Sequence, residues 1–375
     1  MHRLTKFVGR PTGLVLLAVL LLVPATAASC GEDESGPVET TAETQAAGED
    51  ETGFEPLDPP VEVNVAFDDA PGTAGIILAD EFGYFDEVAI EVKYTKFNSG
   101  ADMYTSLAAD RVDVGRGIIT ASLFNGAARG ISVWVVADSG TNVKGEGNYF
   151  GLVVRKDLAD EIQDYSDLEG RKVLIVSRGS INELFLELAL AEGGLTIDDV
   201  ETTVIDSFPD LNAALGNGAA DVAVQIEPLI TRGEQDGILV AFGDASEYAP
   251  DEQVAALLYS PEFAENVEAA RAFMIAYLKG VRDYNDAIIH GGPRQDEIIN
   301  VLVENTFVDD PELWKTMRPT GLNPDGTVNT EAVARDQRFY VEKGLVENPA
   351  PIEKVVDNSF AEYAVEVLGP YEPPE

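Results

Sequence analysis

The chain has 375 residues, with 67 acidic and 25 basic side chains and a formal net charge of -42. Such a charge repels nucleic acid and anionic membrane surfaces, which excludes proteins that bind either of them electrostatically. A single cysteine, Cys30, excludes a disulfide within the chain and a zinc site built from several cysteines. Hydrophobic residues make up 45% of the chain, which is enough for a buried core.

Residues 1–29 have the pattern of a bacterial lipoprotein signal peptide. Three basic residues precede an apolar run over 14–23, which is too short to span a bilayer. Small residues then lead directly to Cys30, so we expect cleavage before this cysteine and attachment of a lipid to it. The alternative is ordinary signal cleavage nearby, which leaves a free thiol. Residues 30–60 carry ten acidic side chains and no basic ones, and this composition predicts a disordered acidic tether.

The body of the chain begins at Val61 and alternates between strand and helix patterns. A first series predicts strands over 61–67, 90–97, 112–115 and 131–137, and helices over 73–82, 101–109 and 121–129. A second series predicts strands over 149–154, 173–176, 200–205, 222–226 and 238–242, and helices over 181–192 and 211–215. After residue 263 only helices are predicted, over 269–289, 295–305, 310–317 and 330–343. The alternation predicts α/β architecture with largely parallel sheets.

Candidate ligand-binding residues follow from the position of these strands. In open α/β sheets, ligands lie beyond the carboxyl ends of the strands, near the N-termini of helices. This rule selects Phe67, Asp68, Asp69, Asn98, Ser99, Arg116, Thr120, Ser139, Ser177, Arg178, Gly179, Ser180, Phe208, Gln225 and Glu227.

The charged candidates indicate two different ligand chemistries. The turn Ser177–Ser180 offers a glycine, free helical N–H groups and Arg178, which together favour a carboxylate, sulfonate or phosphate. Arg116 has the same potential, whereas Asp68 and Asp69 favour an amine or hydroxyl groups. If both sets face one cleft, a zwitterionic or mixed-polarity ligand fits best. The alternatives are a capped helix start with a solvated arginine, and a solvated turn that carries the two aspartates.

Six segments carry a resemblance to a known family. They are Gly83-Tyr84-Phe85 before a strand; Ser99-Gly100-Ala101 with 108–115; Leu152–Leu158; 168–173 with Arg178-Gly179-Ser180; 208–215 with Asp221 and Glu227-Pro228; and Val356-Asp357 with Leu368-Gly369. In this order and spacing, from about residue 61 to about 370, the chain resembles the nitrate/sulfonate/taurine class of ABC-importer substrate-binding proteins. This class is often grouped with the binding proteins for thiamine-pyrimidine precursors.

The resemblance implies a periplasmic-binding-protein type II fold, in which two α/β lobes enclose a ligand cleft and are joined by two chain crossings. Lobe one would comprise 61–150 and 260–370, and lobe two 151–259, with crossings near 148–154 and 253–259. The resemblance also implies no cofactor or metal, a small-molecule ligand, and an ABC permease with its ATPase as partner. We therefore expect a monomeric protein that is held at the outer face of the cell membrane by a lipid on Cys30.

Other functions were weighed against this one. Some fungal relatives synthesise the thiamine pyrimidine with a histidine and a cysteine-rich motif, but His290 is the only histidine of the body and no cysteine follows Cys30. The stretch Asn323–Gly326 resembles part of a calcium loop, but acids are missing at the first and last positions that an EF-hand requires. A lipoprotein that senses a ligand for a receptor is the open alternative, because nothing in the sequence separates it from a transport component.

Overall fold

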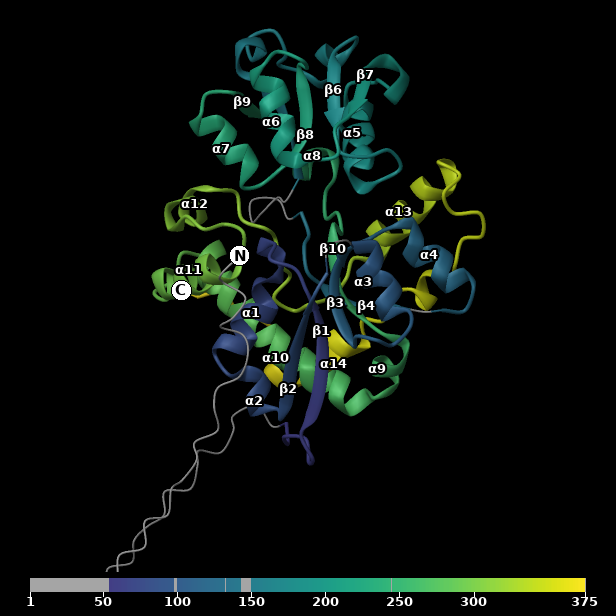
Figure 1. Ribbon diagram of the computed structural model, residues 1–375, viewed down its shortest axis with the longest axis vertical. Helices are drawn as coiled ribbons and strands as arrows, with labels where there is room; N and C mark the ends of the chain where they lie inside the picture. The colour runs from purple at the N-terminus through teal and green to yellow at the C-terminus, as the bar shows by residue number, and fades with distance from the viewer. Residues whose placement is uncertain (1–53, 98–99, 132, 143–149, 244, 375) are drawn as a thin grey trace, which may run out of the picture. The chain divides into compact units, whose positions relative to one another are not determined.

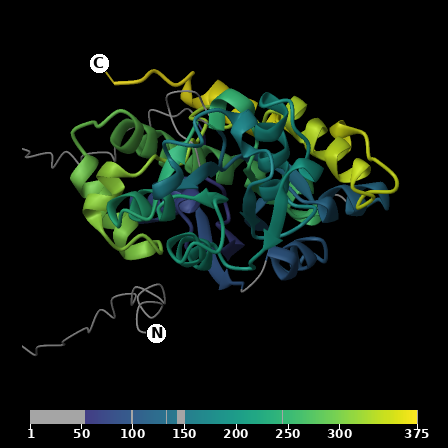
Figure 2. The same ribbon diagram turned by 90° about the horizontal axis from the view of Figure 1, so that it is seen from above.

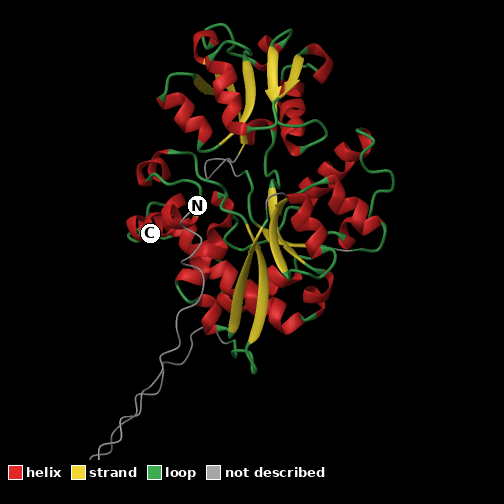
Figure 3. Ribbon diagram, viewed as in Figure 1, coloured by secondary structure: helices red, strands yellow, loops and turns green. Residues whose placement is uncertain are grey.

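The computed structural model describes residues 54–97, 100–131, 133–142, 150–243 and 245–374. The predicted signal peptide, Cys30, the first part of the tether, Asn98 and Ser99 lie outside the described residues. Residues Thr52–Glu375 form one unit that contains two separate sheets (Figures 1 and 3).

The first sheet has the strand order β2-β1-β3-β10-β4. Its strands are β1 (Val61–Phe67), β2 (Ile90–Lys96), β3 (Val114–Ile118), β4 (Trp134–Asp138) and β10 (Ala255–Tyr259). Strand β1 pairs in parallel with β2 and β3, and β10 runs antiparallel to both β3 and β4. The carboxyl ends of β1, β2, β3 and β4 therefore meet at one edge of the sheet.

The second sheet repeats this arrangement, with the order β7-β6-β8-β5-β9. Its strands are β5 (Phe150–Arg155), β6 (Lys172–Ile175), β7 (Glu201–Val204), β8 (Val222–Ile226) and β9 (Leu239–Phe242). Strand β6 is parallel to β7 and β8, and β5 is antiparallel to β8 and β9. The chain passes from the first sheet to the second between β4 and β5 and returns between β9 and β10.

Most predicted strand ends differ by one to three residues from those of the structure, and two differences bear on the site. The run Ala255–Tyr259, which the prediction placed in the second crossing and counted with lobe two, is β10 of the first sheet. All five residues of β10 are buried, so the strand lacks the apolar–polar alternation by which half-buried strands are found. Strand β3 continues to Ile118, which puts Arg116 inside the strand. The division into two lobes stays a prediction.

Helices cover both faces of the first sheet. They are α1 (Ala74–Glu81), α2 (Tyr84–Glu87), α3 (Gly100–Leu107), α4 (Ala121–Ala128), α9 (Pro261–Glu265), α10 (Val267–Tyr284), α11 (Gln295–Asn305), α12 (Pro311–Thr316), α13 (Thr330–Glu342) and α14 (Ser359–Leu368). Helix α10 packs against α1 and α14 and buries one continuous apolar core with the sheet. Figures 1 and 2 show α11 and α12 on one side of this sheet and α4 with α13 on the other.

The second sheet carries α5 (Ile181–Glu192), α6 (Phe208–Gly216), α7 (Leu229–Gln235) and α8 (Ala245–Tyr248). Serine side chains cap two of them, because Ser180 accepts a backbone N–H at the start of α5 and Ser207 does so at α6. Helix α6 buries Leu211 and Leu215 against strand residues Val153 and Leu174. Within the described part of the chain, no helix has the length and apolar character that a membrane crossing needs.

Candidate functional site

The first group of predicted ligand residues lies where β1, β3 and β4 approach one edge of the first sheet. The Arg116 side chain on β3 is only 5% exposed, and its NH1 lies 3.4 Å from Asp68 Oδ2. Its Nε and NH2 donate to the Ser139 carbonyl oxygen at 3.3 and 3.2 Å. Asp68 Oδ1 also accepts from the Ala70 N–H at 3.1 Å and from the Thr73 hydroxyl at 2.5 Å. We call Asp68, Thr73, Arg116 and Ser139 the arginine-116 cluster; in it the guanidinium is neutralised from within the protein.

Gly72 allows these side chains to approach one another. The buried Ser139 hydroxyl donates to the Gly72 carbonyl oxygen at 2.9 Å. A Cβ atom at Gly72 would overlap the Arg116 guanidinium and would lie 2.8 Å from the Ser139 carbonyl oxygen. The loop after β1 therefore requires glycine at this position for Arg116 to reach Ser139.

The other predicted residues of the first sheet make different contacts from those of the arginine-116 cluster. Asp69 forms an exposed ion pair with Lys96 at 3.1 Å. The Phe67 ring is 9% exposed and packs edge-on against Tyr94, with 5.3 Å between ring centroids. Thr120 is exposed at the N-terminus of α4, and its side chain makes no capping hydrogen bond there. Their contact with ligand remains a prediction, as it does for Asn98 and Ser99.

Asp138, the last residue of β4, is a buried acid next to the predicted site residue Ser139. Its Oδ1 accepts from the Gly140 N–H at 3.1 Å and from the Gln253 amide, and its Oδ2 accepts from the Asn323 N–H at 2.6 Å. Burial raises the pKa of Asp138 to about 6, although these donors and Arg116 oppose the increase. Gln253 precedes β10, so this carboxyl group ties the return crossing to the end of β4.

A cavity of about 260 Å³ opens beside Asp138, Gln253 and Asn323. Among the described residues that line it, none belongs to the predicted ligand set. The three polar side chains donate to or accept from one another or from nearby backbone groups. The cavity therefore lies within the framework of the first sheet, and the three polar side chains beside it already bond protein groups.

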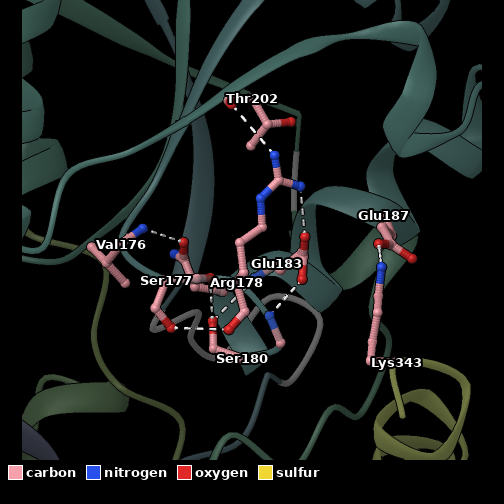
Figure 4. A network of polar contacts seen from close by, with 10 residues as sticks. Val176, Ser177, Arg178, Ser180, Glu183, Glu187, Thr202 and Lys343 are labelled. Atoms are coloured by element: carbon pink, nitrogen blue, oxygen red, sulfur yellow. Dashed lines mark hydrogen bonds and ion pairs between the residues drawn. The ribbon is translucent and has the colours of Figure 1, made fainter. Parts of the chain in front are cut away.

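The second group of predicted residues forms the turn between β6 and α5 (Figure 4). The Ser180 hydroxyl donates to the Ser177 carbonyl oxygen at 2.9 Å and accepts the Glu183 N–H at 3.5 Å. Gly179 has a φ of 62°, which favours glycine. The Arg178 NH1 donates to Glu183 Oε1 at 2.9 Å, and its NH2 lies 3.4 Å from the Thr202 carbonyl oxygen on β7. The Arg178 side chain thus extends from the turn toward β7.

Glu183 is the residue of this turn that sequence reasoning missed. Its Oε2 accepts the Gly179 N–H at 2.6 Å, and its side chain is only 3% exposed. We call Arg178, Gly179 and Glu183 the β6–α5 turn cluster. A local signal existed, because Ser180 and Glu183 have the S-x-x-E spacing of a capping box. The acid here bonds the N–H one residue earlier than the usual capping box does.

The remaining predicted residues of the second sheet are held by protein groups. The Gln225 side chain is fully buried and donates to the Phe208 carbonyl oxygen at 2.9 Å and to Asn212 at 2.8 Å. Phe208 is the first residue of α6, and its ring lies 6.0 Å from that of Phe150. Glu227 is 2% exposed and accepts from Thr231 and, at 3.0 Å, from Arg318 NH1. No local pattern predicts this last pair, because 91 residues separate its members.

A buried pair of carboxyl groups lies beside the return crossing. Glu252 is fully buried and accepts from Nε of Arg335 at 3.0 Å and from its NH2. Asp336 on α13 is also fully buried, and no described residue donates a hydrogen bond to either of its oxygens. Burial, reinforced by the charge of Glu252, raises the pKa of Asp336 well above its usual value. Both effects favour the protonated form of the Asp336 carboxyl group.

The chain was compared with families of known proteins. A family model described as NMT1/THI5 like matches residues 70–287. The chain belongs to this family. The match covers more than half of the chain, including β2 to β10, and therefore both residue clusters named above except Asp68.

Relatives of the chain are named as binding proteins. A protein of Bacillus subtilis (strain 168) that is named as a candidate aliphatic sulfonates-binding protein is 26% identical over 303 residues, covering 78% of this chain and 85% of the relative. A binding protein of Brucella abortus (strain 2308) is 25% identical over 219 residues, covering 58% of this chain and 64% of that protein. These names agree with the expectation of a binding protein rather than an enzyme.

Solved structures show the fold. The periplasmic aliphatic sulphonate binding protein SsuA of Escherichia coli has a TM-score of 0.63 at 20% identity, over 79% of this chain and 91% of that one. The periplasmic nitrate-binding protein NrtA of Synechocystis PCC 6803 has a TM-score of 0.61 at 15% identity, over 83% and 90%. The chain therefore has the periplasmic-binding-protein fold, as its sequence predicted.

Proposed function

We propose that this protein is the extracytoplasmic solute-binding component of an ABC importer and takes up a small polar nitrogen or sulfur compound. The observation that carries the proposal is the repeated strand order of the two sheets in a chain of the NMT1/THI5-like family. In each sheet, polar groups gather where parallel strands end: the arginine-116 cluster in the first and the β6–α5 turn cluster in the second. Such strand ends are where open α/β sheets bind ligands.

The ligand would bind between the two sheets and bring them together by a hinge motion at the two crossings. Relatives are named for aliphatic sulfonates and for nitrate, which supports a small polar ligand. The closed protein would then deliver this ligand to a membrane permease. Cys30 would carry a lipid, and the acidic segment to residue 60 would tether the body to the outer face of the membrane.

A ligand screen by thermal unfolding tests the binding function. The full-length chain would be heated with nitrate, aliphatic sulfonates, amines, pyrimidines and amino acids in turn. A ligand present at 100 times its Kd stabilises the folded state by about 2.7 kcal/mol, so one chemical class is expected to raise the melting temperature by about 5–10 °C. Reversible melting with no shift from any compound, repeated by calorimetry at 25 °C, would count against a solute-binding function.

The lipid anchor needs a separate test. The wild-type chain and a Cys30→Ser variant would be expressed in a bacterium that processes lipoproteins, and membrane and soluble fractions would be compared. We expect the wild type in the membrane fraction with a mass increase at Cys30, and the variant released. Equal release of both proteins would contradict the anchor without affecting the proposal of solute binding.

A further inference from the structure

The turn between β6 and α5 has the groups of an oxyanion site, and one of the chain's own carboxylates already occupies it. The Gly179 N–H and the Arg178 guanidinium are donors of the kind that bind sulfonate, nitrate or carboxylate. Glu183 accepts from the first at 2.6 Å and from the second at 2.9 Å. Its side chain is 3% exposed, so it is a buried internal anion (Figure 4).

Two neighbouring donors of this turn are also engaged within the protein. The Val176 N–H donates to Asn182 Oδ1 at 2.9 Å, and the Ser180 hydroxyl donates to the Ser177 carbonyl oxygen at 2.9 Å. The Arg178 side chain runs toward Thr202 on β7, away from Ser180 (Figure 4). An external oxyanion at this turn would have to displace Glu183 or lie beside its charge, and both are costly in a buried setting.

The arginine-116 cluster is neutralised in a similar way. Arg116 is 5% exposed and gives its Nε and NH2 to the Ser139 carbonyl oxygen and its NH1 to Asp68. The more exposed member of that pair is the acid, since the Asp68 side chain is 39% exposed. The charge that this cluster presents outward is therefore negative, which favours hydrogen-bond donors over an anion.

We infer that the ligand of this protein is a nitrogenous organic molecule of zero or positive charge that carries no sulfonate, nitrate, carboxylate or phosphate group. The inference rests on the proposed function and narrows it, because Glu183 takes the position that the oxyanion of a sulfonate or nitrate would need. The ligand offers N–H donors to Asp68 and to the backbone carbonyl groups of the turns. Glu183 is thus a specificity-determining residue that excludes anions.

The test measures anion affinity by calorimetry with the full-length chain and two matched variants. Glu183→Gln removes the internal charge at the turn. Glu187→Gln removes one charge a single turn further along α5, where Glu187 pairs with Lys343 (Figure 4). The probes are nitrate, ethanesulfonate and taurine. We expect a Kd weaker than about 1 mM for all three on the wild type, and at least a tenfold gain for Glu183→Gln only, since removing one unit of charge at close range is worth at least this much.

Three outcomes would overturn the inference. A wild-type Kd below about 10 µM for any of the three probes, each of which carries a nitrate or sulfonate group, would do so while upholding solute binding. An equal gain in both variants would show that net charge, rather than the position of Glu183, controls anion affinity. The third outcome is measured on the wild type alone, so it does not depend on the folding of a variant. The Gly179 amide signal in a ¹⁵N–¹H spectrum should stay in place when ethanesulfonate is added. A saturable shift of this signal would contradict the proposal.

The positive side of the inference is tested with the same chain. Primary amines and amino-substituted heterocycles that carry no acidic group would be titrated beside the carboxylated or sulfonated forms of the same skeletons. We expect saturable binding within the first set and none within the second. Binding restricted to the acidic forms would overturn the inference and leave the proposed function intact.

Discussion

The two arginines that the sequence selected make the same contacts in opposite settings. Arg116 in the first sheet and Arg178 beside the second each pair with one carboxylate and with one backbone carbonyl group. In the first pair the cation is buried, with 5% exposure against 39% for its acid. In the second pair the acid is buried, with 3% exposure against 52% for the arginine. The comparison teaches that burial, more than the identity of the partners, decides which member of a pair supports the fold.

The difference also decides what each pair presents to its surroundings. Arg116 bonds to the loop after β1 and to the loop after β4, and so joins them. Its partner Asp68 remains partly accessible to solvent. Glu183 is buried inside the turn after β6, where it accepts the Gly179 N–H. Its partner Arg178 extends toward β7. An arginine at a strand end is therefore insufficient to indicate an anion site, because the nearest acid has to be located first.

Arg116→Ala is expected to have the largest effect on stability. The change leaves Asp68 and the Ser139 carbonyl oxygen without their cation, and we expect a loss of about 3 kcal/mol in the free energy of unfolding. Arg178→Ala should cost only about 1 kcal/mol, because removing a half-exposed side chain lets water reach Glu183. Urea unfolding of both variants beside the wild type measures the two values. Equal losses of unfolding free energy in the two variants would contradict the view that burial decides which member of each pair supports the fold.

The structure also shows which helices and strands can be predicted from the sequence alone. Strand β8 and helices α5 and α11 have the predicted boundaries, because their apolar spacing and their flanking residues agree. Strand β10 was missed as a strand because an unbroken buried run has no period of two. Two of its partners in the first sheet, β3 and β4, precede it by more than one hundred residues.

The sequence predicted which of these residues lie near strand ends, but not how their side chains are oriented. The strand-end rule found Asp68, Arg116, Ser139 and the turn Ser177–Ser180, and the structure joins them into two clusters. The rule gives no direction for a side chain, so it could not show that Arg178 turns toward β7. Pairs such as Glu227 with Arg318 depend on contacts between distant segments, for which a single sequence holds no local signal.

Gly72→Ala tests the close packing around the Arg116 guanidinium without removing any charge. A methyl group at this position overlaps the Arg116 guanidinium, which has to move away from Ser139. We expect a loss of about 1–3 kcal/mol in stability, as for other overpacked sites. Combining Gly72→Ala with Arg116→Ala should cost less than the sum of the two single changes, because the overlap disappears with the side chain. An additive result in urea unfolding would show that Gly72 acts independently of Arg116.

A third pair, the buried carboxyl groups of Glu252 and Asp336, extends the comparison to the protonation state of an acid. Glu252, Arg335 and Tyr340 surround Asp336, whose pKa is raised well above its usual value by burial and then by Glu252. Between its unfolded and its folded pKa, Asp336 binds its proton more tightly in the folded state, so stability is highest at low pH and falls as pH rises. Each unit of difference between the two values is worth about 1.4 kcal/mol.

Asp336→Asn tests this dependence, because an amide keeps a neutral donor toward Glu252 at every pH. We expect the variant to lose less stability than the wild type between about pH 6 and pH 8. Asp138, with its pKa of about 6, titrates in both proteins, so it does not alter the difference between them. Urea unfolding at several pH values gives both slopes, and Asp160→Asn on an exposed turn serves as a control for net charge. Parallel slopes in all three proteins would mean that Asp336 is ionised in the folded state.

Lys343→Gln should have the smallest effect. Lys343 at the end of α13 pairs with Glu187 on α5, and the two side chains are 26% and 28% exposed, so water screens the pair more than it screens Arg116. We expect a loss below about 1 kcal/mol, which shrinks further in molar salt because exposed charges are screened. The loss for Arg116→Ala should change little with salt, since its guanidinium is buried. The result would contradict this expectation if Lys343→Gln lost as much unfolding free energy as Arg116→Ala, or if its loss were equally insensitive to salt. Contacts between α13 and α5 would then contribute stability that burial does not predict.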